Sequence, residues 1–280
     1  MPLAKWSSEE ASGVWPRPLH AKLSTVASSS AAVLIPGSIF LPTHGCCTKL
    51  LTAAFDRAEA HIFANSTTRH SRLRVAGLRE HGLPPEHERL CGTADTAATT
   101  PFGGLRVEVS APAATALQLG VDESYALHLD TTGSVLTAAT EWGALRGIET
   151  FTQLVQQART STWTSSGHAT SNPAAAVLCG LPLAINDAPA YAWRGMLVDS
   201  SRHFLPLIEH VLPLIDAMAS TKLNVLHWHI TDAQSFPFGS EAVPELPQHG
   251  AYAPGLTYTL GEMRAVVAYA HARGVRSPMN

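Results

Sequence analysis

The sequence has little cysteine, little net charge and no long apolar run, and each of these shortages excludes a class of protein. Its 19 basic and 22 acidic residues leave a net charge of -3, without the basic surface that nucleic acids or anionic lipids require. No stretch approaches the roughly 18 apolar residues of a membrane span. The four cysteines contain no C-x-x-C spacing, which argues against a zinc site or a thiol redox motif.

The cysteines and the N-terminus also bear on the compartment. Residues 1–13 lack the apolar core of a secretory signal, so we interpret them as an unstructured N-terminus. Asn65 begins a glycosylation sequon, which matters only if the chain enters the secretory route. Free buried thiols are the simpler interpretation of the cysteines and one or two disulfides are the alternative; the four residues are Cys46, Cys47, Cys91 and Cys179.

The 280 residues, 45% of them hydrophobic, can bury a sizeable core in one or two domains. Residues 14–158 mix strand and helix patterns and predict a small α+β domain. Its expected elements are a strand pair over 33–41 that turns at Pro36 and Gly37, a helix over 49–63, a loop over 65–103, a strand over 105–110, a hairpin over 125–130 and 135–139, and a helix over 142–157. Residues 159–186, rich in Ser, Thr, Ala and Gly, are interpreted as a linker or loop.

From residue 187 onward, strands and helices alternate, which implies parallel strands with right-handed crossovers. The expected elements are a strand over 195–199, a helix that Pro206 opens and Pro213 kinks, a strand over 223–230, a helix that begins at a Thr259–Glu262 capping box and ends near Gly274, and the first residues of a third strand at Val275.

Polar residues gather where these two strands end. Asp199 and Arg202 follow the first strand, and His229 and Asp232 lie at the end of the second. In βα barrels, the carboxyl ends of the strands carry the active site. An arginine held there can donate a fork of two hydrogen bonds to neighbouring hydroxyls or to a carboxylate.

Two alternatives stay open on the second strand. Trp228 is either a platform on which a sugar stacks or a core residue, and the core is the commoner place for an aromatic in a buried strand. His227 and His229 share one strand face, as a metal pair would. No third ligand is evident nearby, so we interpret these histidines, with His203, as hydrogen-bonded polar residues of the fold.

Three linked motifs then stand in the order R-G-x-L-x-D-x-S-R-H-x-L-P, K-x-N-V-x-H-W-H-x-x-D, and S-F-P with P-E-L. This stretch resembles the opening of the catalytic barrel of eukaryotic β-N-acetylhexosaminidases, glycoside hydrolase family 20. V-W-P-R-P near the start and W-G-A-L-R-G-I-E-T-F over 142–151 resemble the small α+β domain that precedes that barrel. The resemblance covers most of residues 14–276.

The resemblance implies substrate-assisted, retaining hydrolysis without a metal or cofactor. In this mechanism the 2-acetamido oxygen of the terminal sugar attacks the anomeric carbon while a glutamic acid protonates the leaving oxygen. Arg202 matches the arginine that binds the hydroxyls of the terminal N-acetylhexosamine. Asp232 matches the aspartate that supports the acid glutamate through a histidine. The catalytic acid and the aspartate before it would lie beyond Asn280, so no catalytic residue is assigned in this chain.

Two departures from the family pattern accompany the match. Ala233 stands where the family usually has a second aspartate. Between Arg202 and Asn224 the chain is one residue longer than the usual family spacing, close to Pro213.

We therefore predict an α+β domain followed by an incomplete TIM-type α/β barrel over 187–280, with two to three βα units. Such an N-terminal fragment is expected to be poorly stable and inactive alone. The alternatives are a non-catalytic partner or regulator that dimerises with a full-length hexosaminidase subunit, and a sugar-binding module. The expected ligands are glycans ending in N-acetylglucosamine or N-acetylgalactosamine, and the expected location is the lysosome, the vacuole or the outside of the cell.

Overall fold

The computed structural model describes residues 16, 18–23, 30–41, 48–63, 100–111, 116–158, 161–163, 169–171 and 175–279. The chain divides into two compact units. The first contains the residues up to Ala114 and Glu123–Ala188, and the second contains Thr115–Asp122 and the residues from Pro189 onward. The expected unstructured N-terminus lies outside the described residues, as does most of the expected loop over 65–103.

The first unit is built on a six-stranded mixed sheet with the strand order β1-β11-β5-β6-β4-β3, accompanied by a three-stranded sheet β2-β10-β7 and a small pair β8-β9. The strands of the first unit are β1 His20–Leu23, β2 Ser30–Val33, β3 Phe40–Leu41, β4 Leu105–Val109, β5 Tyr125–Leu129, β6 Ser134–Ala138, β7 Gln156–Ala158, β8 Ser161–Trp163, β9 Ala169–Ser171, β10 Ala175–Leu181 and β11 Leu183–Asp187. The strand over 105–110 and the 125–139 hairpin are confirmed, the latter as the antiparallel pair β5 and β6.

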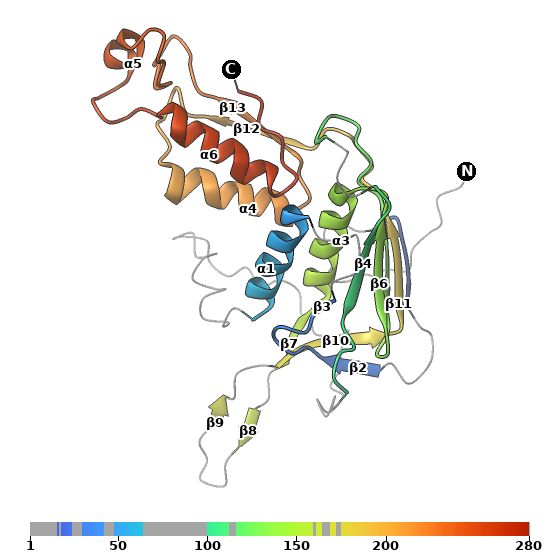
Figure 1. Ribbon diagram of the computed structural model, residues 1–280. Helices are drawn as coiled ribbons and strands as arrows, with labels where there is room; N and C mark the ends of the chain where they lie inside the picture. Colours follow the sequence, from blue (N-terminus) through green and yellow to red (C-terminus); the bar gives the residue numbers. More distant parts are fainter. Residues whose placement is uncertain are drawn as a thin grey trace. The chain divides into compact units, whose positions relative to one another are not determined.

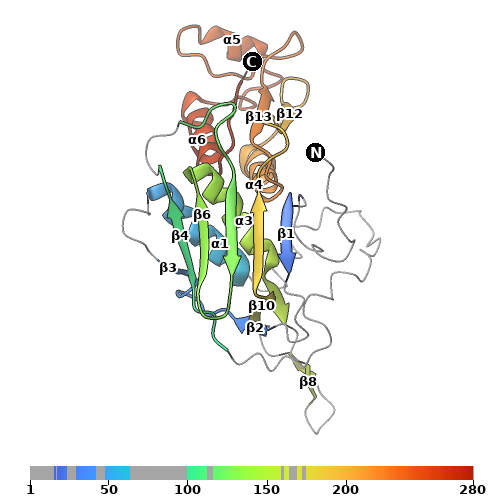
Figure 2. The same cartoon turned by 90° about the vertical axis from the view of Figure 1, so that its right-hand side faces the viewer.

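Two helices, α1 (Lys49–Phe63) and α3 (Glu141–Leu154), cover one face of the large sheet (Figure 1 and Figure 2). Buried and more exposed positions alternate along β5 and β6, so each strand buries one face. The expected helix over 49–63 is confirmed, and its buried residues recur at helical spacing. The strands and helices that the sequence predicts most clearly therefore share one core.

The helix α3 ends earlier than expected, at Leu154 instead of Gln157. Thr140 caps its first turn, because its hydroxyl accepts a hydrogen bond from the Gly143 N–H. At its end, Val155 has an extended backbone and Gln156 begins β7, which pairs with β10. The sheet hydrogen bonds replace the last helical turn that the apolar spacing suggested.

Two further expectations are wrong in this unit. The segment 33–41 turns at Pro36 and Gly37 as expected, but its arms do not pair: β2 pairs with β10, and β3 pairs with β4 in the other sheet. The segment 159–186 is not a loop where the structure describes it, because it contains β8, β9, β10 and most of β11. Leu183 and Ile185 are buried at alternate positions, the period of a strand, within a composition that suggested a linker.

Cys179, on β10, forms a disulfide. The other three cysteines lie outside the described residues. The interpretation of all four cysteines as free thiols is therefore wrong for Cys179, and the alternative of at least one disulfide holds.

The second unit has two parallel strands, β12 (Gly195–Asp199) and β13 (Val225–His229), with the register Gly195↔Val225 to Asp199↔His229. Its helices are the π-helical segment η2 Leu207–Val211, α4 Leu212–Ser220, α5 Glu245–Gly250 and α6 Leu260–His271. Residues 276–279 continue the sheet through parallel bridges from Arg276 to Val225 and from Met279 to Trp228. The expected third parallel strand is thus present as these bridges.

The helix between the two strands differs from expectation at both prolines. Pro206 is extended and precedes the helix instead of opening it. The first turns are π-helical, with the Leu212 N–H bonded to the Leu207 carbonyl five residues back, and Pro213 follows in the first turn of α4. A π-helical turn takes up one residue more than an α-helical turn. The structure therefore has a π-helical segment before Pro213, in place of a kink within one α-helix.

The helix α6 begins and ends as its sequence predicts. Thr259 and Glu262 form a complete capping box, and Gly274 ends the helix at a φ of 68°. The apolar faces of α4 and α6 pack on β12 and β13 in one core that includes Ile215, Met263 and Val266. No helix in the described parts of the chain combines the length and hydropathy needed to cross a bilayer.

Candidate functional site

The two faces of the β12–β13 sheet have different roles. Val198, Leu226 and Trp228 point to the helices and belong to the buried core. The alternate positions, which include Asp199 and His229, lie on the opposite face. Since the strands are parallel, their carboxyl ends lie side by side and carry the residues that follow them to one edge of the sheet.

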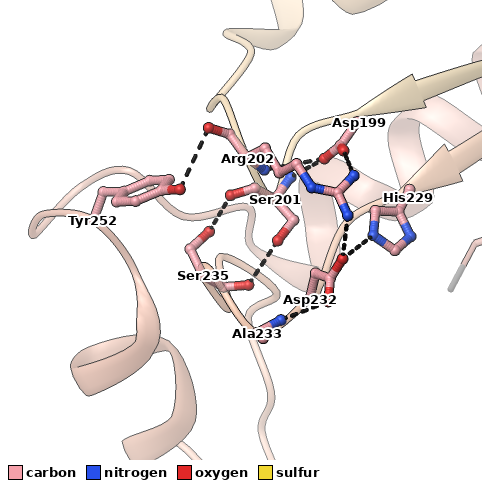
Figure 3. A network of polar contacts seen from close by, with 8 residues as sticks. All are labelled: Asp199, Ser201, Arg202, His229, Asp232, Ala233, Ser235 and Tyr252. Carbon is pink, nitrogen blue, oxygen red and sulfur yellow. Dashed lines mark hydrogen bonds and ion pairs between the residues drawn. The ribbon is translucent and has the colours of Figure 1, made fainter.

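At this edge Arg202 lies between two carboxylates (Figure 3). Its Nη1 bonds to Oδ2 of Asp199, and its Nη2 lies 2.7 Å from Oδ2 of Asp232. The Arg202 side chain is 57% exposed, so the guanidinium is held from two sides and open to solvent on the rest. The structure brings together the two residues singled out from the sequence, Arg202 and Asp232.

Asp199 organises the turn that presents Arg202. Its Oδ1 accepts hydrogen bonds from the backbone N–H groups of Ser201 and Arg202, each at 3.0 Å. The hydrogen bond from the Arg202 backbone N–H is the main cause that lowers the pKa of Asp199, and the Arg202 guanidinium lowers it further. Asp199 is therefore a charged residue that shapes the loop.

Asp232 is held in a similar way on the neighbouring loop. Its Oδ1 accepts the Ala233 N–H at 2.7 Å, and its Oδ2 lies 3.1 Å from Nε2 of His229. The Ala233 N–H is the main cause that lowers the pKa of the Asp232 carboxyl, followed by His229 and Arg202. A general acid needs a pKa raised toward the working pH. Because the pKa of each carboxyl is lowered, Asp199 and Asp232 are suited to orient groups and not to donate a proton.

Trp228 is a core residue in this structure. Its side chain is fully buried, its Nε1 donates to Oγ of Ser200 at 2.9 Å, and its ring meets that of Tyr258 edge to face. Of the two interpretations left open by the sequence, the core position holds. Arg194 has a scaffold role, because its Nε and Nη1 donate to the backbone carbonyls of Lys222 and Tyr191.

The histidines separate into two groups. His229 belongs to the site because its Nε2 contacts Asp232. His203 is exposed and follows Arg202 in the sequence, and His227 is half-buried two residues before His229 on β13. Within the described ranges, no group of three or more His, Cys, Asp or Glu side chains is arranged to hold a metal ion.

Ser201 is among the polar residues that follow the first strand, but sequence reasoning missed its partner Ser235, and it missed Tyr252. The Tyr252 hydroxyl donates to the Arg202 carbonyl at 3.3 Å, and the two serines bond to each other's backbone. Ser201 is the serine of the S-R-H motif and Ser235 is the serine of the S-F-P motif, so both residues were already contained in the sequence motifs. Only the folded chain shows that the two motifs meet.

The sequence contains one Asp-Glu dipeptide, Asp122–Glu123, and the glutamate of this dipeptide forms a buried ion pair. Glu123 belongs to the first unit, where its carboxylate lies 2.7 Å from the Arg146 guanidinium. Both side chains are almost fully buried. A carboxylate sealed into an internal ion pair has no access to a substrate.

Comparisons with known proteins agree with this geometry. Residues 14–154 match the family described as beta-acetyl hexosaminidase like, and residues 191–277 match the catalytic domain of glycosyl hydrolase family 20. The chain is 44% identical over 158 residues to mouse beta-hexosaminidase subunit beta, an alignment that covers 56% of this chain and 26% of that protein. It is 33% identical over 275 residues to the pig subunit beta, covering 96% of this chain and 44% of that protein.

Solved structures show the same fold at lower identity. The chitobiase of Flavobacterium johnsoniae aligns with a TM-score of 0.67 and 23% identity, over 95% of this chain and 34% of that one. The N-acetyl-β-hexosaminidase of Streptomyces plicatus aligns with a TM-score of 0.63 and 22% identity, over 95% of this chain and 45% of that one. The chain thus spans between a quarter and a half of the length of these relatives. Since one family model alone matches half of the chain, and a second follows it in the expected order, the chain belongs to the β-hexosaminidases of glycoside hydrolase family 20.

Proposed function

We propose that this chain is part of a β-N-acetylhexosaminidase and that Arg202 binds the hydroxyls of the terminal, non-reducing N-acetylhexosamine. One observation carries the proposal: the guanidinium lies at the carboxyl ends of two parallel strands, held by Asp199 and Asp232, with more than half of its side chain exposed. The two carboxylates engage two of its five N–H donors, which leaves donors for a ligand. A planar guanidinium fits neighbouring hydroxyls better than an ammonium group does.

The proposed reaction is hydrolysis in which the substrate's own acetamido group is the nucleophile. Asp232 would support the acid glutamate through a histidine, as the family motif implies. Because hydrogen bonds lower the pKa of Asp199 and Asp232, neither is a suitable proton donor for the leaving oxygen. The described residues of this site therefore serve binding and orientation, and we expect the 280-residue chain to bind sugar without hydrolysing it.

Binding and turnover are tested separately on the purified 280-residue chain. Calorimetric titration with N-acetylglucosamine should give a dissociation constant that rises at least about tenfold in Arg202→Ala, since hydrogen bonds from a charged group are lost. Arg264→Ala is the matched control, because Arg264 is also an exposed arginine and lies on α6. Equal affinity of the parent and Arg202→Ala would overturn the assignment of Arg202.

Turnover is measured with a chromogenic N-acetylglucosaminide. We expect no release of the chromophore above a mock preparation. Hydrolysis that follows the purified chain through chromatography, and that Arg202→Ala abolishes, would contradict the expected lack of turnover while supporting the role of Arg202.

A second candidate function is that of a non-catalytic partner of a full-length hexosaminidase subunit. It is favoured by the exposed apolar residues along β12, where Leu197 is 58% exposed and Met196 40% exposed. Exposed apolar side chains on a strand favour association with another protein. Co-purification with a full-length family 20 subunit would support this candidate, provided that Leu197→Lys weakens it and the control Arg264→Ala does not.

We propose a location in the lysosome, the vacuole or outside the cell. The disulfide at Cys179 supports it, because disulfides persist in oxidising compartments and are rare in the cytosol. Microscopy of the tagged protein tests this location, and a diffuse cytosolic signal would contradict it.

A further inference from the structure

Two loops carry the candidate site, and a pair of buried serines joins them (Figure 3). Oγ of Ser201 donates to the carbonyl of Ser235 at 3.0 Å, and Oγ of Ser235 donates to the carbonyl of Ser201 at 2.7 Å. The two residues are 34 positions apart in the chain. This reciprocal arrangement, called here the serine pair, links the backbone of the loop after β12 to that of the loop after β13.

Each serine is next to, or bonded to, a residue of the site. Ser201 immediately precedes Arg202. The Ser235 carbonyl, which accepts from Ser201, also accepts the backbone N–H of Asp232 at 3.1 Å. A short path through backbone and hydroxyl hydrogen bonds therefore runs from Arg202 to Asp232, beside the direct contact between their side chains.

The serine pair is buried, so its hydrogen bonds are costly to lose. Ser201 is fully buried and Ser235 is 4% exposed, so water does not replace a lost hydroxyl partner easily. The Arg202 side chain, in contrast, is largely exposed, and an exposed ion pair alone holds a flexible arginine weakly. The exposed Arg202 side chain thus follows directly after a buried, hydrogen-bonded serine.

We propose that Ser201 and Ser235 are positioning residues that set the separation of Arg202 and Asp232, and through it the affinity of Arg202 for the sugar. The part of this proposal that concerns the sugar rests on the proposed function. The part that concerns Arg202 and Asp232 does not, since it follows from contacts within the protein.

The test uses two measurements on the 280-residue chain and its variants Ser201→Ala and Ser235→Ala. Titration of the Asp232 carboxyl by carbon-13 NMR reports how closely Arg202 is held. We expect its pKa to rise in both variants, by a measurable part of the rise seen in Arg202→Ala, because the guanidinium is one of the groups that lower it. Calorimetry should show N-acetylglucosamine binding weakened by about fivefold, the loss typical of one misplaced hydrogen bond.

Ser200→Ala is the matched control. Ser200 is also fully buried and also lies in the loop after β12, but its hydroxyl bonds to Trp228 and Tyr258 in the core and not to Ser235. The variant Ser200→Ala should lower the free energy of unfolding about as much as Ser201→Ala or Ser235→Ala does, but it should leave the pKa of Asp232 unchanged. If one of the two serine variants does not fold, the other still removes one hydrogen bond of the pair.

The outcomes separate the two proposals. An Asp232 titration that is unchanged in folded Ser201→Ala or Ser235→Ala overturns the serine pair as a positioning device, and so does an equal shift in Ser200→Ala. If the titration shifts as expected but Arg202→Ala binds sugar as well as the parent, the positioning of Arg202 stands and the proposed function fails.

Discussion

Nη2 of Arg146, on α3, lies 2.7 Å from Oε1 of Glu123, which precedes β5, and the two side chains are 3% and 4% exposed. The Arg146 Nε donates to the same carboxylate oxygen at 2.8 Å. This buried ion pair connects the helix that covers the large sheet to the chain that enters β5.

Breaking this pair should destabilise the first unit strongly. We expect Arg146→Met to lower the free energy of unfolding by about 3–5 kcal/mol, because it removes the guanidinium that the buried Glu123 carboxylate contacts. The double variant Arg146→Met with Glu123→Gln should lose less than the sum of the two single changes. Urea unfolding measures all three proteins, and a loss below about 1 kcal/mol in Arg146→Met would contradict this account of the pair.

Glycine at position 147 permits the close contact between α3 and the sheet. A Cβ at Gly147 would lie 2.3 Å from Cδ1 of Leu136 and 3.1 Å from Cδ2 of Tyr125. Gly147→Ala should therefore cost about 1–3 kcal/mol of unfolding free energy through overpacking, despite the better helix propensity of alanine. Gly261→Ala is the control in α6, where the nearest atom lies 3.9 Å from the added Cβ. Thermal unfolding should show a lower Tm only for Gly147→Ala, and an equal or higher Tm there would refute the close packing.

The start of α6 depends on its capping box. Oγ1 of Thr259 accepts the Glu262 N–H at 3.2 Å, and Oε2 of Glu262 accepts the Thr259 N–H at 2.8 Å. Thr259→Ala should lower the free energy of unfolding by about 1 kcal/mol, since it leaves a helix N–H without a partner. Glu262→Gln retains an acceptor and should cost less. Urea unfolding of both variants tests the order, and the reverse order would contradict it.

The second unit should lose stability in acid through Asp199. Hydrogen bonds from the Arg202 backbone N–H and guanidinium hold its pKa below the ordinary 3.8, so the folded state favours the charged carboxylate. This contribution is fully present above pH 3.8 and is lost as the pH falls through the lower folded value. Urea unfolding from pH 7 to pH 2.5 should show the difference between the parent and Asp199→Asn shrinking below pH 3.8. A constant difference would rule out this linkage.

Local patterns predicted α1, the start of α6 and the β5–β6 hairpin well. The spacing of Leu51, Ala54 and Ala58 sufficed for the bounds of α1, because an amphipathic helix forms its hydrogen bonds within its own segment. The capping box at Thr259 and the turn between β5 and β6 are local in the same sense.

Pairing between distant segments was not predictable in this way. The strand β11 pairs with β1, so that Leu183 lies opposite Leu23 although the two residues are far apart in the sequence. A composition rich in small and polar residues suggested a linker over 159–186, and the alternation of Leu183 and Ile185 is too short a pattern to contradict it. A strand is stabilised by its neighbour in the sheet, and the sequence does not state which neighbour it meets.

The same distinction between local patterns and long-range contacts applies to the candidate site. The sequence by itself determined the family motifs and the polar residues at the strand ends, and it singled out Arg202 and Asp232, because these depend on residue type and spacing alone. Only the tertiary structure decided that Arg202 lies between two carboxylates, that Trp228 belongs to the core, and that Ser201 and Ser235 bond to each other's backbone. Arg202 and Asp232 are 30 positions apart and the two serines 34, and hydrogen bonds across such a separation form only once parallel strands have brought their carboxyl ends together.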